Sequence, residues 1–527
     1  MKKIINKKLL FFILAVGLNL IEFFRNTVNF DIFSVTNNLT GLVILLYILS
    51  QNKIKKYIGI PSLCITIAAV VACFFSRQMR DAWFTTCITR QIISAIFNAW
   101  WIAIIGFERL KNLISALSKK KADVRIDVLF VIWAVAGIWT VFSRSETFWP
   151  VWFLGMFSLF YTTVFSEEEW YDMQNALVTG SIFSYVAFEV MFLPFRPYDI
   201  PRYSGVFSNP NNFACYTVII YLFVLVKMHM LHTQKKHILW KILYSVIGIV
   251  LLDISFMTGC RTVWIIEILL TIFWLAFVVV GKWKMKIWKT LLFPFAMLAA
   301  SVILLFPTYA AIRYVPTIHP HPIWFFGEYS DARVTSMDPK DSEKYVEFDE
   351  MLDENLGRVG EMIGGLFAKS PFVMVAQAEE TVHVETAQTI SWLPRSLFLR
   401  YKYAMTYASR FNLLGHNQNE IRFKDDDGVL IWHSQNYWIQ ISYMYGLPFG
   451  ILMLAAFVIN FIRSIKTFRS EDKKGINILP LMFMMLYFVY GLMEITWITG
   501  YIMLTLAYLL PHPQWYGKKY VLEDKNK

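Results

Sequence analysis

The chain has 527 residues, of which 57% are hydrophobic, 17% aromatic and 17% charged. Soluble globular domains carry about 25% charged residues, so the composition excludes an ordinary soluble protein. The formal net charge of +12 does not indicate nucleic-acid binding, because no basic and aromatic module stands outside the apolar segments. Length and composition instead indicate a multi-pass membrane protein.

Apolar segments of near-spanning length recur along the whole chain. The first follows the lysine-rich residues 1–8 and has no small-residue cleavage site behind it, so we expect a retained span and not a removed signal peptide. We predict an all-α polytopic membrane protein with about 12–14 transmembrane helices, the last two of which could form one broken helix pair. The expected spans are 9–24, 39–52, 57–75, 91–108, 127–143, 148–165, 174–194, 212–228, 240–258, 262–280, 288–308, 436–462, 477–493 and 496–511.

The basic residues indicate how the chain is oriented. If each span reverses direction, the connections on the N-terminal side hold 30 Lys and Arg, and those on the other side hold eight, apart from one long loop. The positive-inside rule then predicts a multi-pass protein of the cytoplasmic membrane with both termini in the cytoplasm. The five cysteines are scattered singly, which predicts neither a disulfide framework nor a metal site.

The eight basic residues of the outer connections are all arginines. Arginine binds phosphate through two parallel N–H groups and loses water more easily than lysine does. The set therefore favours a phosphate-rich substrate on the outer face, although arginine could simply be tolerated near the interface. The residues are Arg25, Arg77, Arg80, Arg90, Arg144, Arg196, Arg202 and Arg261.

One long outer loop interrupts the series of spans. Residues 309–434 hold 12 basic and 18 acidic residues and five of the nine histidines. Apolar residues recur with helical spacing in 342–369 and 394–411, which predicts a mostly helical loop that caps the membrane body. The expected organisation is a first transmembrane part at 1–308, this loop, and a last transmembrane part at 435–527.

Arg261 lies between two apolar spans with few polar neighbours. A charge so close to hydrocarbon needs a partner, and Asp253 or Glu267 could supply one. The residue is then either half of a structural ion pair or a clamp for an anion.

A polar outer turn opens the expected span 212–228. Residues 202–212 read RYSGVFSNPNN, in which the asparagines can cap the next helix. Capping alone explains Asn209 and Asn211, but it leaves Arg202 unexplained. An arginine beside a positive helix end suits a phosphate group.

His433 stands at the mouth of the expected span 436–462, among the aromatic residues Trp432, Tyr437 and Trp438. A histidine near neutral pKa suits general-base activation of a hydroxyl, although a single interfacial histidine often has a structural role. The other loop histidines have no zinc-ligand spacing, so we expect no metal and no cofactor.

Together these motifs resemble the O-antigen ligase and O-antigen polymerase-like family of bacterial membrane glycosyltransferases. RYSGVFSNPN at 202–211 resembles its R-x-S-G-x-F-x-N-P-N signature, and Arg261-Thr262 resembles its S-R-[TG] element, with Cys260 in place of serine. A long outer loop follows in both. The resemblance covers residues of about 200–460.

Two further motifs of the family fall in and after the long loop. Arg400, followed by YA at 403–404 and LLG at 413–415, resembles R…W-x-x-A…P-L-x-G, with tyrosine for tryptophan. HSQNYWIQ at 433–440, with Gly446 beyond it, resembles H-[SP]-H-N-x-Y-L-Q…G. Gln435 stands where that pattern has its second histidine, which leaves His433 as the one base candidate.

The resemblance implies transfer or polymerisation of a glycan from an undecaprenyl-diphosphate carrier to an acceptor hydroxyl on the outer face, without a metal. Arginines would neutralise the diphosphate, and the acceptor would be a glycan, lipid or protein. The expected catalytic residues are His433, Arg261 and Arg400, and Arg395 is an alternative to Arg400. The expected substrate-binding residues are Arg202, Asn209, Asn211, Asn436 and Trp438.

Polymerase and ligase differ only in the acceptor, which no motif identifies; the long loop slightly favours a polymerase. A transporter or flippase of lipid-linked oligosaccharide is the alternative from another class. Such a protein should carry a charged cavity among its spans and roughly symmetric halves.

Overall fold

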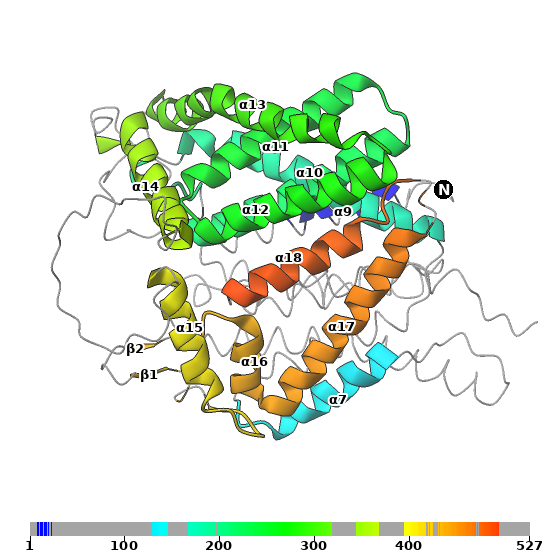
Figure 1. Ribbon diagram of the computed structural model, residues 1–527, viewed down its shortest axis with the longest axis vertical. Coiled ribbons are helices and arrows are strands. Elements are labelled where there is room, and N and C mark those ends of the chain that lie inside the picture. Colours follow the sequence, from blue (N-terminus) through cyan, green and yellow to red (C-terminus); the bar gives the residue numbers. More distant parts are fainter. Residues whose placement is uncertain are drawn as a thin grey trace, which may run out of the picture.

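The computed structural model describes residues 128–145, 167–195, 198–318, 344–367, 395–424 and 430–494 with isolated gaps, and single residues between 8 and 23. The described part is mostly helical (Figure 1). Six of its helices are long and apolar enough to cross a membrane. The spans expected at 39–52, 57–75, 91–108, 148–165 and 496–511 lie outside the described residues.

Most of the helices expected within the described residues are present. Their bounds are α7 Val128–Phe142, α9 Glu167–Phe192 with the 3-10 turn η1 Leu193–Phe195, α10 Pro210–Thr233, α11 Ile238–Met257, α12 Arg261–Phe273 with the π-helical continuation η2 Trp274–Lys282, α13 Ile287–Tyr314 with the 3-10 turn η3 Val315–Ile318, α14 Phe348–Phe367, α15 Arg395–Ala408, α16 Tyr437–Tyr445, α17 Leu447–Arg469 and α18 Leu479–Met493. The helices α14 and α15 confirm the two helical segments expected in the long loop.

The single span expected at 436–462 is wrong. The chain forms two helices there, α16 and α17, which are separated at Gly446 by a backbone with φ of 94°. Leu447 and Pro448 open α17, and proline suits the first turn of a helix, whose N–H groups have no partner within the helix. A glycine at positive φ, with proline two residues later, therefore turns the chain sharply.

The long loop departs from the expectation in two details. The helix α13 and its turn η3 continue to Ile318, ten residues into the segment expected as loop. A short antiparallel hairpin also pairs β1 Phe423–Lys424 with β2 Leu430–Ile431, so the described part is not purely helical.

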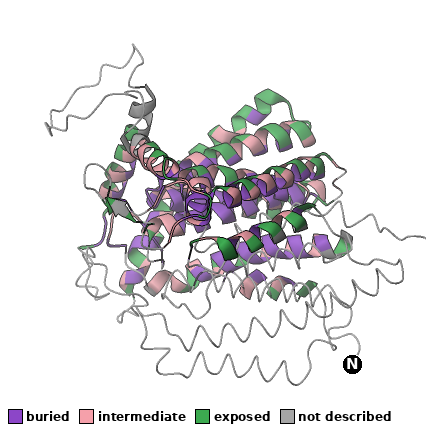
Figure 2. Cartoon of the chain, turned by 90° about the horizontal axis from the view of Figure 1, so that it is seen from below, coloured by how far each residue is buried: buried purple, intermediate pink, exposed green. Residues whose placement is uncertain are grey.

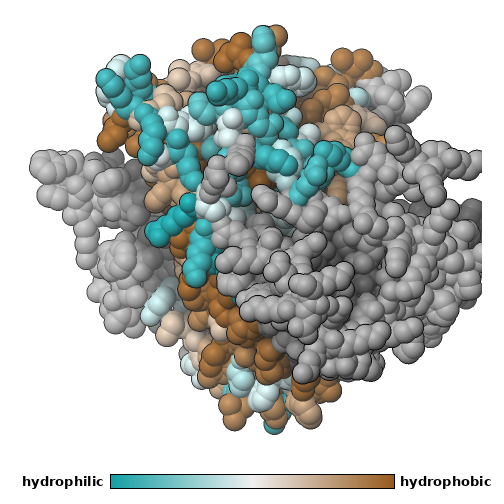
Figure 3. Space-filling model, turned by 90° about the vertical axis from the view of Figure 1, so that its right-hand side faces the viewer, coloured by the Kyte–Doolittle hydropathy of each residue, from teal (hydrophilic) through white to brown (hydrophobic). Residues whose placement is uncertain are grey.

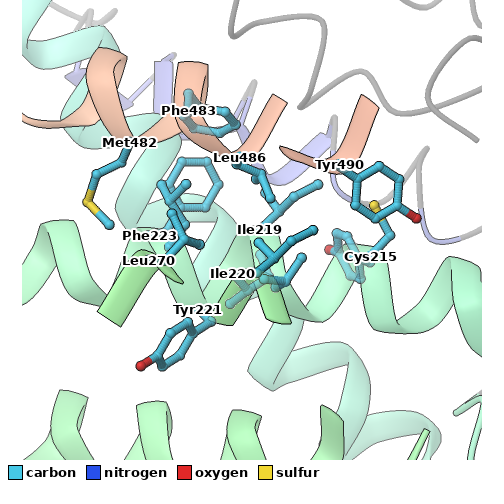
Figure 4. Packing of buried hydrophobic residues seen from close by; sticks show 14 of the residues in the cluster. Cys215, Ile219, Ile220, Tyr221, Phe223, Leu270, Met482, Phe483, Leu486 and Tyr490 are labelled. Atoms are coloured by element: carbon cyan, nitrogen blue, oxygen red, sulfur yellow. The ribbon is translucent and has the colours of Figure 1, made fainter. Parts of the chain in front are cut away.

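The helix α10 lies at the centre of the packed core. In the most apolar stretch of α10, 89% of the residues are buried. The corresponding figure for α13 is 6%, so α13 exposes most of its apolar residues. Figure 4 shows Ile219, Ile220 and Phe223 of α10 packed against Leu270 of α12 and Phe483 of α18. Figure 2 shows buried residues concentrated within the helix bundle. Burial of this kind fixes the ends of these helices relative to one another.

The two ends of the bundle differ. The helices α14 and α15 lie at one end, on the left of Figure 1, where α18 ends and α12 begins; we call this the loop end. The opposite end carries the α10–α11 and α17–α18 connections, which include Lys235, Lys236 and Lys474. Figure 3 shows hydrophilic residues gathered on the described part of that end.

Candidate functional site

Arg202 is held by both segments that it joins in space. Its Nε donates to the carbonyl oxygen of Thr258 at 3.0 Å, and its Nη2 donates to Oδ1 of Asn211 at 2.5 Å. The backbone N–H of Tyr203 adds a bond to the Met257 carbonyl at 2.8 Å. These bonds tie the polar turn before α10 to the turn between α11 and α12. The polar turn at 202–211 and the segment that leads into Arg261-Thr262 therefore meet at one place.

The two expected asparagines have different positions in this turn. Asn209 is the N-cap of α10, and its Oδ1 accepts the N–H of Asn211 at 2.8 Å, with Pro210 in the first turn. Asn211 instead turns its side-chain oxygen to Arg202. Capping thus accounts for Asn209, whereas Asn211 positions the guanidinium.

Arg261 begins α12, and its partner is Glu361 of α14, at 2.7 Å between Nη1 and Oε2. The partners considered from the sequence are wrong. Asp253 accepts from Ser301 Oγ, and Glu267 accepts from Ser255 Oγ at 2.6 Å. Arg261 is the first residue of its helix and its side chain leaves the bundle, whereas those two carboxylates lie inside it. The Arg261–Glu361 pair is partly exposed to solvent, with side-chain exposures of 31% and 69%, so an incoming anion can compete for Arg261.

Arg400 is fixed against the end of α18. Its Nη2 donates to Oε1 of Glu494 at 3.0 Å, and its Nη1 donates to the carbonyl oxygen of Met493. Glu494 is 8% exposed. Burial raises the pKa of Glu494, and the positive charge of Arg400 partly offsets this. The side chain of Arg395, the alternative considered from the sequence, lies outside the described residues.

His433 is half-buried just ahead of α16. Burial lowers its pKa, and the nearby charge of Arg400 lowers it further, so the neutral ring predominates at neutral pH. Its Nδ1 accepts the backbone N–H of Gln435 at 3.4 Å, which is long for a hydrogen bond. The ring is therefore held only weakly at this nitrogen.

The turn that presents His433 is built from the polar residues that follow it. Asn436 caps α16 by accepting from the Ile439 N–H at 3.1 Å, and its Nδ2 donates to the Leu492 carbonyl at 3.1 Å. Gln440 accepts the N–H of Ser434 at 2.8 Å. The positive φ of Gln435, 57°, lets the chain bend between these anchors.

Trp438 lies among aromatic residues of the bundle. Its ring centroid is 5.2 Å from that of Phe457 in α17 and 5.8 Å from that of Tyr487 in α18. This position suits helix packing better than the substrate-binding role expected from the sequence. Asn436 likewise acts as a cap that joins α16 to α18.

Two motif glycines, Gly415 after α15 and Gly446 between α16 and α17, lie against each other's segments. A Cβ on Gly446 would stand 2.0 Å from the Leu413 carbonyl oxygen, and one on Gly415 would stand 2.2 Å from the Met444 carbonyl oxygen. Leu447 N–H donates to the Asn412 carbonyl at 3.0 Å. The close approach anchors the helix that carries Arg400 to the helix that follows His433.

These segments converge at the loop end around Cys260. Burial raises the pKa of the Cys260 thiol to about 11, and the charges of Glu494, Arg202 and Arg400 act on the same thiol. Arg202 is in turn near enough to Arg358 and Arg261 for their charges to add to burial, which lowers its pKa. Arginines from four separate segments thus face one region.

Two residues of this region were not identified from the sequence. Glu494 was assigned to the gap between two expected spans, and only the fold brings it to Arg400. Asn355 of α14 lies against the turn at Gly259, and its position within an amphipathic segment gave no distinguishing signal. In the described part of the chain, no group of three His, Cys, Asp or Glu has the arrangement of a metal site.

Comparisons with known proteins give no match to a family model, a curated protein or a solved structure. Fold and site together define a mostly helical protein whose described part has six helices long and apolar enough to cross a membrane and an arginine-rich site at one end. Its activity follows as a proposal from the chemistry of that site.

Proposed function

We propose that the protein is a multi-pass membrane glycosyltransferase of the O-antigen ligase and polymerase kind. It transfers or polymerises a glycan from an undecaprenyl-diphosphate carrier to an acceptor hydroxyl at the outer face of the cytoplasmic membrane. The convergence of Arg202, Arg261, Arg400 and His433 at the loop end supports this most directly. These residues are spread over more than 230 positions of the sequence, and helix packing has no need to gather them.

The proposed leaving group is undecaprenyl diphosphate. As the glycosidic bond to phosphate breaks, negative charge grows on the diphosphate, and arginines placed in advance stabilise that charge. Arg202 is fixed by two protein acceptors and Arg400 by the end of α18, so little reorganisation is needed. Arg261 becomes available when the anion replaces Glu361.

His433 is the proposed base. Its lowered pKa keeps the ring neutral at pH 7, and a neutral ring can accept the proton of the acceptor hydroxyl as the hydroxyl oxygen attacks the anomeric carbon. The positive charge of Arg400, which together with the larger effect of burial lowers the pKa of His433, also lies near the departing diphosphate in this proposal. Arg400 then acts both on the base that activates the acceptor and on the leaving group of the donor.

A transporter or flippase of the same lipid is the competing proposal. An apolar cavity among the described helices is about 170 Å³ and is lined by residues such as Tyr221, Met228 and Phe293. An apolar lining does not suit the passage of a glycan, which needs polar partners. Among the described residues, the arginines of the site also gather at one end of the helices, which favours transfer.

Reconstitution separates the two proposals. Purified protein in vesicles, supplied with lipid-linked oligosaccharide and no nucleotide, should form longer or acceptor-linked glycan and release undecaprenyl diphosphate. Accessibility of the donor to an added lectin, measured in the same vesicles, reports translocation. Translocation without any new glycosidic bond would replace the glycosyltransferase by a flippase.

A further inference from the structure

Asn355 is a buried amide without a hydrogen-bond partner among the described residues. Its side chain is 0% exposed, yet neither Oδ1 nor Nδ2 has a hydrogen bond within the described part of the protein. Buried polar groups are almost always paired, because an unpaired amide loses its bonds to water on folding. An apolar residue of similar size would give a more stable fold at such a position, unless a ligand binds the amide.

The amide faces the arginine site. Its Oδ1 lies 3.0 Å, and Arg202 Nε lies 3.3 Å, from the point where a Cβ on Gly259 would stand. Gly259 has a φ of +63°, so the absence of a side chain there both permits the turn and lets the two groups approach it closely. Arg358, one turn further along α14, is close enough for its positive charge to lower the pKa of Arg202, in addition to the larger effect of burial.

The start of α14 is anchored by contacts just ahead of the helix. The N–H of Val346 donates to the Tyr198 carbonyl at 2.8 Å, and Arg313 pairs with Glu347 at 3.0 Å, just ahead of the helix. Gly357 and Gly360 have nothing within 4 Å of an added Cβ. Beyond Asn355, the helix is joined to α12 by the partly exposed Arg261–Glu361 pair, and replacement of Glu361 by an incoming anion would release that contact and make room for a ligand beside Asn355.

An amide carries one donor group and one acceptor group, which selects among the parts of the proposed donor. Diphosphate oxygens only accept, so they would satisfy Nδ2 and leave Oδ1 unpaired. A sugar hydroxyl or acetamido group both donates and accepts, and it can satisfy both atoms. The sugar attached directly to the diphosphate is the part that comes next to Arg202.

We propose that Asn355 binds a hydroxyl or acetamido group of the sugar linked directly to the diphosphate, and so contributes to donor specificity. This inference rests on the proposed function. Arg202 and Arg261 would bind the diphosphate itself, while the Asn355 amide of α14 would form hydrogen bonds with the sugar. A site that hydrogen-bonds one such group discriminates strongly against ligands that lack it.

Binding of two lipids tests this inference, with the full-length protein in detergent. The probes are an undecaprenyl-diphosphate-linked oligosaccharide and undecaprenyl diphosphate without sugar. Asn355→Leu should weaken the first by about 10-fold or more and leave the second unchanged. Arg202→Ala should weaken both, and Asp353→Ala, at an exposed position of the same helix, should weaken neither.

Thermal unfolding of the same variants guards against a folding defect. Asn355→Leu removes an unpaired amide, so its melting temperature should equal or exceed that of the unchanged protein; Asn355→Ala serves if leucine does not fit. The inference would be overturned if the Asn355 variants bound the sugar-bearing lipid as tightly as the unchanged protein does. It would also be overturned if they bound both lipids more weakly by the same factor. If the unchanged protein binds neither lipid, the proposed function fails and not merely this assignment.

Discussion

At the scale of single residues, the charge state of His433 links two side chains of the site. Burial and Arg400 both disfavour the protonated ring, so its pKa lies below the ordinary value of about 6.5. A base works in its neutral form, and activity should therefore fall only in acid, below this lowered pKa. The acid limb of the rate profile is the observable consequence.

The substitution Arg400→Gln should move that limb. Removing the positive charge raises the pKa of His433, so the residual kcat/KM should begin to fall at a higher pH than in the unchanged protein. Rates measured over about pH 5 to 9 check this, and His433→Ala should lose the limb together with about 10²–10⁴-fold in rate. A limb of unchanged position in Arg400→Gln and His433→Ala would mean that His433 is not the titrating base.

The sequence predicts the residues of this site better than it predicts their partners. Arg202, Arg400 and His433 stand out as polar groups at the mouths of apolar spans, and they do converge. The partner of Arg261 was sought among carboxylates close in sequence, but the structure places Glu361, 100 residues away, against it. Asn355 and Glu494 were missed for the same reason, because their roles depend on how α14 and α18 pack.

At the scale of elements, the junction of α15 with α16 and α17 depends on the absence of two side chains. Gly446 has a φ of +94°, and a Cβ there would meet the Leu413 carbonyl oxygen. Hydrophobic pattern alone suggested one continuous span through this point, because both α16 and α17 are apolar. The Gly-Leu-Pro order at 446–448 is the signal that could have located the break.

Gly446→Ala should separate this junction. A non-glycine residue held at positive φ costs about 1–3 kcal/mol, and the contact with Leu413 adds to that cost. We expect a lower melting temperature and loss of transfer, since Arg400 and His433 are carried by the joined segments. Gly357→Ala, in an open part of α14, should instead stabilise by about 0.5–1 kcal/mol. A similar melting temperature for both variants would contradict the close packing.

At the scale of the whole molecule, two unlike ends follow from the distribution of charge. Lysines gather in the connections opposite α14, and arginines gather at the loop end. The pattern could be read from the sequence because it needs only the order of the spans and not their packing. Which helices form the core could not be read, since α10 and α13 are similarly apolar and yet α10 is enclosed and α13 is exposed.

Cysteine labelling tests this orientation. On a background without native cysteines, Asp353→Cys in α14 should react with a membrane-impermeant maleimide added to intact cells. Lys236→Cys, exposed in the α10–α11 connection, should react only after the membrane is opened. Both positions are exposed in the fold, so burial does not confuse the result. The reverse pattern would place the arginine site in the cytoplasm and remove the proposed substrate.

Substitutions of Arg261 test most directly the proposal that arginines stabilise a departing diphosphate. The measurement is the rate at which purified protein releases undecaprenyl diphosphate from a lipid-linked oligosaccharide in the presence of acceptor. Loss of one cationic partner of a diphosphate that has left water should cost roughly 2–5 kcal/mol, so Arg261→Ala should be slower by tens- to thousands-fold. Arg261→Lys should also be impaired, because an ammonium cannot replace the planar fork. Glu361→Gln, which removes only the resting partner of Arg261, should keep its rate. Near-normal release by both Arg261 variants would contradict the account and reduce Arg261–Glu361 to a structural ion pair.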